Sequence, residues 1–215
     1  MSAKLIRVLL VDDHAIARNG IRAMLELAPD ICVHGQAETA ADAVAQVRTE
    51  QFDVAVVDIS LPDQSGVELI TKFREKRPVL PVIVLSSHPE EMYGVRTMRL
   101  GAAAYLTKNV SAEMLQAAVH RVACGGKFFS ASMLERLAHA SCGTSAAASA
   151  PHEGLSCREF EIMKRIAAGQ SLTMIGGALF ISPKTVSTHR TRILEKMGFN
   201  CNAQLTRYAI EQNLM

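Results

Sequence analysis

Residues 5–14 read Leu-Ile-Arg-Val-Leu-Leu-Val-Asp-Asp-His, in which a mainly apolar run at 5–11 is followed by two adjacent aspartates. A run this short is typical of a strand, and its near-continuous apolar character indicates burial on both faces. Similar β-rich runs follow at 31–35, 54–58, 82–86 and 103–107. Stretches with apolar residues at helical spacing separate them. This alternation predicts an α/β fold with a doubly wound, five-stranded parallel sheet.

The sequence changes character in its last third. Residues 141–154 read Ser-Cys-Gly-Thr-Ser-Ala-Ala-Ala-Ser-Ala-Pro-His-Glu-Gly, which is typical of a flexible linker. Residues 130–139 before it have the pattern of a short helix, and residues 155–215 after it are helix-patterned throughout. We therefore predict a domain at 1–124, a connecting helix and linker at 125–154, and a smaller all-α domain from residue 155 onward.

The composition excludes several classes of protein. The 215 residues are 49% hydrophobic and 20% charged, which is typical of a folded protein with a core. No apolar run approaches the ~20 residues that cross a bilayer, and the N-terminus lacks the layout of a signal peptide. The five cysteines are scattered without a C-x-x-C pair, which favours reduced thiols over zinc ligands or disulfides. We expect a cytoplasmic protein.

The net charge of +2 is the sum of two opposed parts. The last 61 residues carry eight basic and four acidic side chains, whereas the preceding 154 carry 15 basic and 17 acidic ones. The C-terminal domain is therefore at +4 and the rest of the chain at −2. A small basic helical domain indicates a polyanionic partner, and DNA is the first candidate.

Polar residues stand where the predicted strands end. If the strand order is the flavodoxin-like 2-1-3-4-5, the strand ends bring together Asp12, Asp13, Asp58, Ser86 and Lys108. Three close carboxylates repel one another, and an all-oxygen ligand set suits Mg²⁺, or Mn²⁺, better than zinc. A carboxylate that attacks phosphorus in this field would form an aspartyl phosphate.

Each of these residues also has a simpler explanation. An Asp-Asp pair after a strand is often only a helix cap, and a single lysine is more often a solvated surface charge. The joint placement of the residues at several strand ends favours a site over these explanations.

Four motifs of the first domain resemble those of one family. They are Val-Asp-Asp-His at 11–14, Val-Val-Asp-Ile-Ser-Leu-Pro at 56–62, Val-Leu-Ser at 84–86 and Gly-Ala-Ala-Ala-Tyr-Leu-Thr-Lys at 101–108. The whole first domain thereby resembles the receiver domain of two-component response regulators.

The resemblance implies that Asp58 accepts a phosphoryl group from a sensor histidine kinase. It also implies that Asp13, Asp58 and the backbone carbonyl of Ser60 ligate Mg²⁺, with Asp12 close by as part of the metal site. Ser60 lies two residues past the acceptor, where it would influence the lifetime of the phosphoryl group.

The resemblance further implies that Ser86 and Tyr105 are a switch pair beside Lys108. The Ser86 hydroxyl would be drawn to the phosphoryl group and the ring of Tyr105 would turn inward behind it. His88 would flank the phosphoryl site. One departure is Asn109, because such receivers often have proline after the lysine.

Helix start and stop signals are clear in the C-terminal domain. Ser156 is expected to cap a first helix, Ser171 or Thr173 to start a short second helix, and Ser182-Pro183 to start a third that Gly198 ends. Two helices joined by a tight turn, the second with a basic exposed face, indicate a DNA-binding helix-turn-helix.

Three motifs here resemble the LuxR-type output domain: Leu-Ser-Cys-Arg-Glu at 155–159, Ile-Ser-Pro-Lys-Thr-Val-Ser-Thr-His-Arg at 181–190 and Leu-Glu-Lys-Met-Gly at 194–198. With the receiver, the chain resembles a NarL/FixJ-family response regulator from end to end. The resemblance implies phosphate contacts from Lys184, Thr185, His189, Arg190 and Arg192. It implies that Ser187, Thr188 and Thr191 face base edges.

Two features of the output domain leave alternatives open. Gly176-Gly177 lies inside the second helix, where each glycine costs about 1 kcal/mol relative to alanine. The pair puts the stability and DNA affinity of the domain in doubt. The last helix, from about residue 202 to 212, either pairs two output domains or packs within its own domain.

The sequence therefore predicts a phosphorylation-controlled DNA-binding regulator that is not an enzyme and is a homodimer when active. RNA polymerase is a further candidate partner. Two alternatives remain. An aspartate-nucleophile phosphatase typically has a second acid where Ser60 stands, and an adaptor with a vestigial output domain would not bind DNA. The stimulus, the operator and the sign of regulation are not readable from the sequence.

Overall fold

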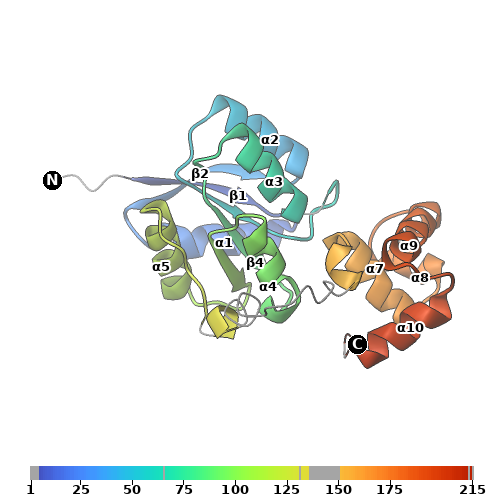
Figure 1. The fold of residues 1–215 in the computed structure, drawn as a ribbon. Coiled ribbons are helices and arrows are strands. Elements are labelled where there is room, and N and C mark those ends of the chain that lie inside the picture. Colours follow the sequence, from blue (N-terminus) through green and yellow to red (C-terminus); the bar gives the residue numbers. More distant parts are fainter. Residues whose placement is uncertain (1–4, 65, 131, 136–150, 213, 215) are drawn as a thin grey trace. The chain divides into compact units, whose positions relative to one another are not determined.

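The computed structural model in Figure 1 describes residues 5–64, 66–130, 132–135, 151–212 and 214. The chain divides into two compact units, residues 1–144 and 145–215. Most of the predicted linker and the second half of the predicted helix at 130–139 lie outside the described residues, although 132–135 are helical. The last four linker residues, Pro151–Gly154, form the 3-10 turn η1. The domain boundaries at 124 and 154 stay a prediction.

The first unit contains the predicted five-stranded parallel sheet. Its strands are β1 (Ile6–Val11), β2 (Ile31–Ala37), β3 (Val54–Val57), β4 (Val82–Ser86) and β5 (Ala104–Thr107). The strand order is β2-β1-β3-β4-β5, and every neighbouring pair is parallel. This confirms the predicted fold class and order. It also places β1, β3 and β4 side by side, so their carboxyl ends share one edge.

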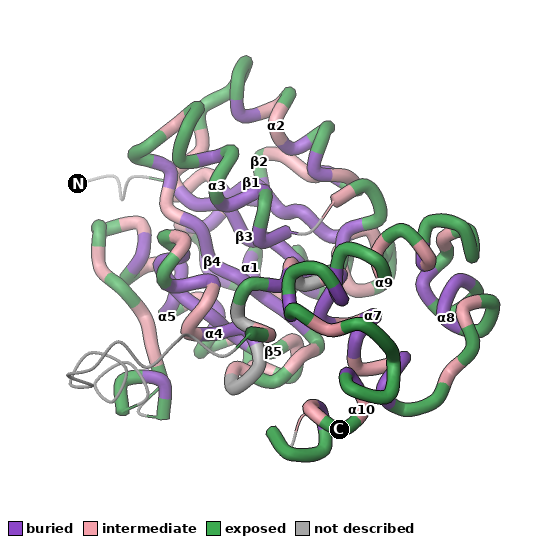
Figure 2. Tube along the Cα trace, turned by 45° about the vertical axis from the view of Figure 1, so that its right-hand side comes forward, coloured by how far each residue is buried: buried purple, intermediate pink, exposed green. Residues whose placement is uncertain are grey.

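Five helices cover the sheet: α1 (Ala15–Glu26), α2 (Ala40–Thr49), α3 (Gly66–Lys76), α4 (Glu90–Arg99) and α5 (Ala112–Ala123). In Figure 1 α2 and α3 lie side by side, as do α1 and α5. Alternate residues of the strands, such as Val8 and Leu10 of β1, pack against Leu25 of α1 and Leu115 of α5 in one buried cluster. Figure 2 shows these buried strands running through the middle of the unit.

The second unit is helical, with α7 (Cys157–Ala167), α8 (Leu172–Ala178), α9 (Pro183–Met197) and α10 (Asn202–Glu211). The helices begin where the capping signals place them. Ser156 forms a capping box with Glu159, and the side chains of Ser171 and Ser182 accept hydrogen bonds from backbone amides of the first turns of α8 and α9. Gly198 ends α9 in a left-handed conformation, with φ 68°. Of the two predicted starts for the second helix, Ser171 is correct.

The described residues contain no helix long and apolar enough to span a membrane. Within the same residues, the thiols of Cys32, Cys124 and Cys201 are free.

The two glycines of α8 have different surroundings. A Cβ added at Gly176 would lie 2.7 Å from the backbone carbonyl oxygen of Ile181, whereas one added at Gly177 would meet nothing within 4 Å. The amide of Ile181 in turn donates to the carbonyl of Gly176 at 3.0 Å. Close approach of the turn before α9 therefore explains Gly176, so this glycine is no sign of a vestigial domain. Nothing in the structure explains Gly177.

We expect opposite effects from alanine at these two positions. Gly176→Ala should destabilise the helical unit by about 1–3 kcal/mol because the methyl group pushes against backbone. Gly177→Ala should stabilise it by up to about 1 kcal/mol through helix propensity. Hydrogen exchange of α9 amides in the full chain measures both changes. Equal effects of the two substitutions would contradict the packing explanation of Gly176.

Candidate functional site

The carboxyl edge of the sheet brings the three predicted aspartates together. Asp12 and Asp13 follow β1, and Asp58 follows β3. The backbone N–H of Asp58 donates to the carbonyl of Val11 at 2.9 Å, which continues the β1–β3 pairing to the edge of the sheet. The side chains of Asp12 and Asp58 are almost completely buried, with exposed fractions of 1% and 4%.

Lys108 reaches both buried carboxylates. Its backbone N–H donates to the carbonyl of Ser86 at 2.8 Å, which fixes the start of its loop beside β4. Its Nζ lies 2.7 Å from Oδ2 of Asp12 and 2.8 Å from Oδ2 of Asp58. The ammonium group of Lys108, the residue that follows β5, therefore joins the ends of β1 and β3, as the strand order predicts.

Burial and charge act in opposite directions on these groups. Burial raises the pKa of Asp58 above its ordinary value, and the adjacent Lys108 opposes this while Asp12 reinforces it. Burial alone would lower the pKa of Lys108, but the carboxylates of Asp58 and Asp12 raise it above its ordinary value. Lys108 therefore stays a cation, and its charge favours the ionised form of Asp58.

The same edge has the donor atoms of a cation site. Ligand atoms of Asp12, Asp13, His14 and Asp58 all lie within 4.8 Å of one another. Within the described residues, the buried Oδ2 of Asp12 and Oδ1 of Asp13 accept no hydrogen bond. Each lies 2.7 Å from a cationic or titratable nitrogen, Lys108 Nζ and His14 Nδ1 respectively. Closely spaced carboxylate oxygens of this kind fit Mg²⁺ or Mn²⁺.

Ser86 and Tyr105 both bind the loop between β4 and α4. The fully buried hydroxyl of Ser86 accepts a hydrogen bond from the backbone N–H of His88 at 3.1 Å. The hydroxyl of Tyr105 donates to the carbonyl of His88 at 2.9 Å, and its ring is only 3% exposed. The predicted switch pair therefore meets at one residue, and the ring of Tyr105 already lies inside.

Ser60 and Gly66 belong to the loop after Asp58. The backbone N–H of Ser60 donates to Oδ1 of Asp58 at 3.3 Å, and the Ser60 side chain is exposed. A Cβ at Gly66 would collide with the backbone carbonyl oxygen of Asp58, so only glycine allows α3 to begin this close to Asp58.

Two residues around the site were not predicted. Arg18 donates from Nη1 to the carbonyl of Asp12 at 2.6 Å and from Nη2 to Glu38 at 2.7 Å, so it ties the first strand end to the loop after β2. The carboxylate of Asp63 accepts from the backbone amides of Ala40 and Ala41 at 2.9 Å each. A basic residue just inside the first helix was the only sequence signal for Arg18.

The second unit presents α9 as a polar surface. Its inner face, with Val186, Ile193, Leu194 and Met197, is buried as predicted. The predicted DNA-contacting residues that are exposed are Lys184, Thr185, Thr188, Thr191 and Arg192, while Ser187, His189 and Arg190 are half-buried.

Arg190 is one of two basic residues of α9 whose side chains are bound within the unit. Its Nε donates to Oδ1 of Asn202, at the start of α10, at 2.6 Å. Lys196 is also tied within the unit, because its Nζ lies 2.6 Å from Oε2 of the buried Glu159. Lys184 and Arg192 are therefore the basic side chains that α9 exposes on its outer face.

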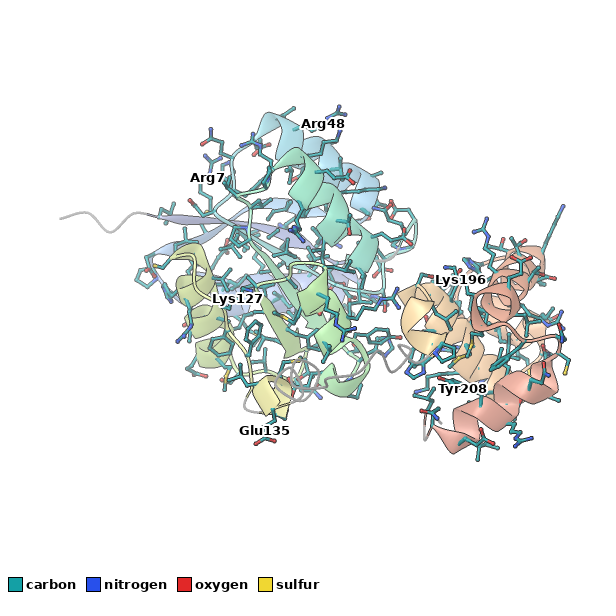
Figure 3. All side chains as sticks on the ribbon, in the orientation of Figure 1. Arg7, Arg48, Lys127, Glu135, Lys196 and Tyr208 are labelled. Atoms are coloured by element: carbon teal, nitrogen blue, oxygen red, sulfur yellow. The ribbon has the colours of Figure 1, made fainter. Side chains whose placement is uncertain are left out.

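The last helix packs within its own unit. Leu205 and Ala209 of α10 are buried, and α10 contacts α7. The hydroxyl of Tyr208, labelled in Figure 3, lies 2.6 Å from Nδ1 of His152 in η1. Ile210 of α10 is 57% exposed, so part of the surface of this helix is not covered by its own unit.

The fold and the two surfaces define a class of protein: a regulator with a receiver-type α/β unit and a helix-turn-helix unit. Residues 8–120 match the response regulator receiver domain, and residues 153–209 match the bacterial regulatory proteins of the luxR family. The chain belongs to the NarL/FixJ family of two-component response regulators, as its motifs predicted. This family is regulatory and is not a family of classical enzymes, which disfavours the phosphatase alternative.

The similarity extends over the whole chain. Response regulator UvrY of Escherichia coli K12 is 34% identical over 210 residues, covering 98% of this chain and 96% of UvrY. Response regulator GacA of Pseudomonas aeruginosa is 33% identical over 211 residues, covering 98% of each. Among solved structures, RcsB of Salmonella enterica serovar Typhimurium, bound to promoter P1flhDC with the phosphomimetic BeF3-, matches at TM-score 0.59 and 25% identity, covering 94% of this chain and 97% of RcsB.

Proposed function

We propose that the chain is a transcription regulator whose DNA binding is controlled by phosphorylation of Asp58 by a sensor histidine kinase. The observation that carries this proposal is the buried carboxylate of Asp58, held beside Lys108 and Asp12 at the sheet edge. A carboxylate oxygen of Asp58 would attack phosphorus, and the bond from phosphorus to the kinase imidazole nitrogen would break. Lys108 favours the ionised carboxylate that this attack requires. Its ammonium group would also contact the oxygens of the transferred phosphoryl group.

Asp12, Asp13, Asp58 and the backbone carbonyl of Ser60 would hold Mg²⁺, or Mn²⁺ in its place. The ion would supply positive charge to the phosphoryl oxygens during transfer. The close spacing of the Asp12, Asp13 and Asp58 carboxylate oxygens, all within 4.8 Å of one another, supports this assignment. His14 lies in the same cluster, but its side chain is 66% exposed, and an oxygen set is sufficient for Mg²⁺.

Phosphorylation would act through the loop that Ser86 and Tyr105 bind. A phosphoryl oxygen on Asp58 would attract the Ser86 hydroxyl and disturb the hydrogen bond that it accepts from His88. The Tyr105 ring is already buried, so its movement on phosphorylation would begin from a position inside the domain. The ring would move together with the His88 carbonyl, because the Tyr105 hydroxyl donates a hydrogen bond to it. The proposed output is a change in α4, which begins directly after this loop.

The outer face of α9 would enter the major groove of DNA. Lys184 and Arg192 would contact phosphates together with Thr185 and His189, while Ser187, Thr188 and Thr191 would face base edges. Arg190 would contribute mainly by holding α10 against α9. A domain at +4 should bind weakly alone, so we propose that two chains pair on DNA as a homodimer. RNA polymerase is a further proposed partner, and DNA as target implies a cytoplasmic location.

The DNA half of the proposal is tested by salt titration of the full chain on a duplex of random sequence. Arg192→Ala should weaken binding and lower the slope of log K against log salt concentration by about 1, because one phosphate contact is lost. Arg207→Ala, on α10, is the matched control, since it removes the same charge from an 81% exposed side chain away from α9. An equal slope for the two variants would remove Arg192 from the interface.

Control by phosphorylation is tested by sequencing the DNA fragments that the chain binds with and without acetyl phosphate and Mg²⁺. We expect an enriched set of sites in one state that is depleted in the other. Identical sets in both states would contradict control of DNA binding by phosphorylation. No bound DNA in either state would contradict the proposed function and favour the adaptor alternative.

A further inference from the structure

The chain does not leave the receiver unit at the end of α5. The backbone N–H of Phe128 donates to the carbonyl of Ala103 at 2.9 Å, and Phe128 forms a parallel bridge with Ala104 of β5. Arg121 of α5 donates from Nε to the carbonyl of Lys127 at 2.7 Å. The segment of residues 127–130 and 132–135, called here the exit segment, therefore returns along the open edge of the sheet.

The exit segment then attaches to the first residue of α4. The hydroxyl of Ser130 donates to Oε1 of Glu90 at 2.6 Å, and the hydroxyl of Ser132 donates to the same oxygen. Ser130 also caps the short helical turn that follows, because its Oγ accepts from the backbone N–H of Met133 at 3.1 Å. One carboxylate on α4 therefore fixes both serines that begin this turn.

Met133 forms the second attachment. Its side chain is only 1% exposed, and a Cβ added at Gly94 of α4 would lie 1.9 Å from its Cε. The end of the Met133 side chain therefore packs directly against the backbone of α4 at Gly94, where glycine leaves room for it. The next residues point outward: Leu134 is 53% exposed, and Figure 3 shows Glu135 at the far end of the turn.

The start of α4 is also connected to the phosphoryl site. The backbone of His88 is bound by Ser86 and Tyr105, and its ring lies 5.1 Å from the ring of Tyr93 in α4. Only Pro89 separates His88 from Glu90. A displacement of this loop therefore acts directly on the carboxylate that holds the exit segment.

We propose that the exit segment is an intramolecular latch, closed on Glu90 and Gly94 of α4 in the unphosphorylated chain and released when Asp58 is phosphorylated. Release frees the chain that leads to the helix-turn-helix unit, so that unit gains freedom to pair and to engage DNA. The latch rests on the proposed function, because its opening signal is the phosphoryl group on Asp58.

Hydrogen exchange of the full chain tests the closed latch without any phosphoryl donor. Met133→Ala removes the buried side chain that packs beside Gly94 and should speed exchange of the amides of Phe128, residue 133 and Leu134 at least tenfold. Gly20→Ala in α1, where a Cβ meets nothing within 4 Å, is the matched control and should change none of them. Gly94→Ala should have a smaller effect than Met133→Ala, because its added Cβ meets the flexible end of the Met133 side chain. Unchanged exchange in Met133→Ala would overturn the latch.

Coupling is tested by repeating the exchange on wild-type chain incubated with acetyl phosphate and Mg²⁺, with intact mass measured on the same sample. We expect the same three amides to exchange at least tenfold faster in the phosphorylated chain. A phosphoryl group added with exchange unchanged would overturn the coupling alone. Absence of added mass would overturn the proposed function, and the coupling with it.

Discussion

Incubation with acetyl phosphate and Mg²⁺ should add one phosphoryl group to the wild-type chain and none to Asp58→Ala. The reason is geometric as well as chemical. Asp58 is the carboxylate that lies against Lys108 at the end of the central strand β3, with Asp12 on the neighbouring strand end. Alanine removes the nucleophile and leaves the positive charge in place, so the loss should be complete. Intact-mass measurement of the full chain reports it directly.

Asp42→Ala is a suitable control, because Asp42 is an exposed carboxylate on α2 of the same unit. It should take up one phosphoryl group as the wild-type chain does. A mass increase that persists undiminished in Asp58→Ala would show that another residue is the acceptor. The next carboxylates to substitute would then be Asp12 and Asp13, which share the cluster.

The fold was largely predictable because its signals are local. Apolar runs of strand length marked β1 and β4 to within one residue, and the serines at 156, 171 and 182 marked three helix starts. The convergence of Asp12, Asp58 and Lys108 followed from strand order alone, since parallel strands end at one edge. Each of these inferences needs only the residue pattern and a general rule of chain topology.

The remaining features depend on contacts between residues far apart in the sequence. No periodic pattern in the sequence predicts that Met133 packs against Gly94. Nor does any such pattern predict that Arg18 donates to the Asp12 carbonyl. Gly176 looked like a defect because helix propensity counts only its own helix, whereas its reason lies in the backbone of Ile181. The hydrogen bond from Arg190 to Asn202 was not predictable either, because charge says nothing about which face of a helix a residue occupies.

Lys108→Met should destabilise the receiver unit by about 3–5 kcal/mol at pH 7 without Mg²⁺, because it leaves buried carboxylates without their cation.

The loss of stability in Lys108→Met should be smaller near pH 4. Burial already raises the pKa of Asp58, and without Lys108 it rises further. A carboxyl whose pKa is raised by folding favours the folded state at low pH, and that contribution is lost as the pH rises through its folded-state pKa. The ammonium of Lys108 is charged throughout this range, since its pKa is raised above 10.5.

Urea unfolding followed through the exchange of β3 amides measures this loss at both pH values. Lys76→Met, at an exposed position in α3, is the matched control and should change the stability little at either pH. Mg²⁺ should restore part of the stability of Lys108→Met at pH 7, by about 2.7 kcal/mol at a hundredfold excess over its dissociation constant. The ion then replaces the missing positive charge between Asp12 and Asp58. A loss independent of both pH and Mg²⁺ would mean that Lys108 acts through packing of its aliphatic chain, and the electrostatic account of this edge would be wrong.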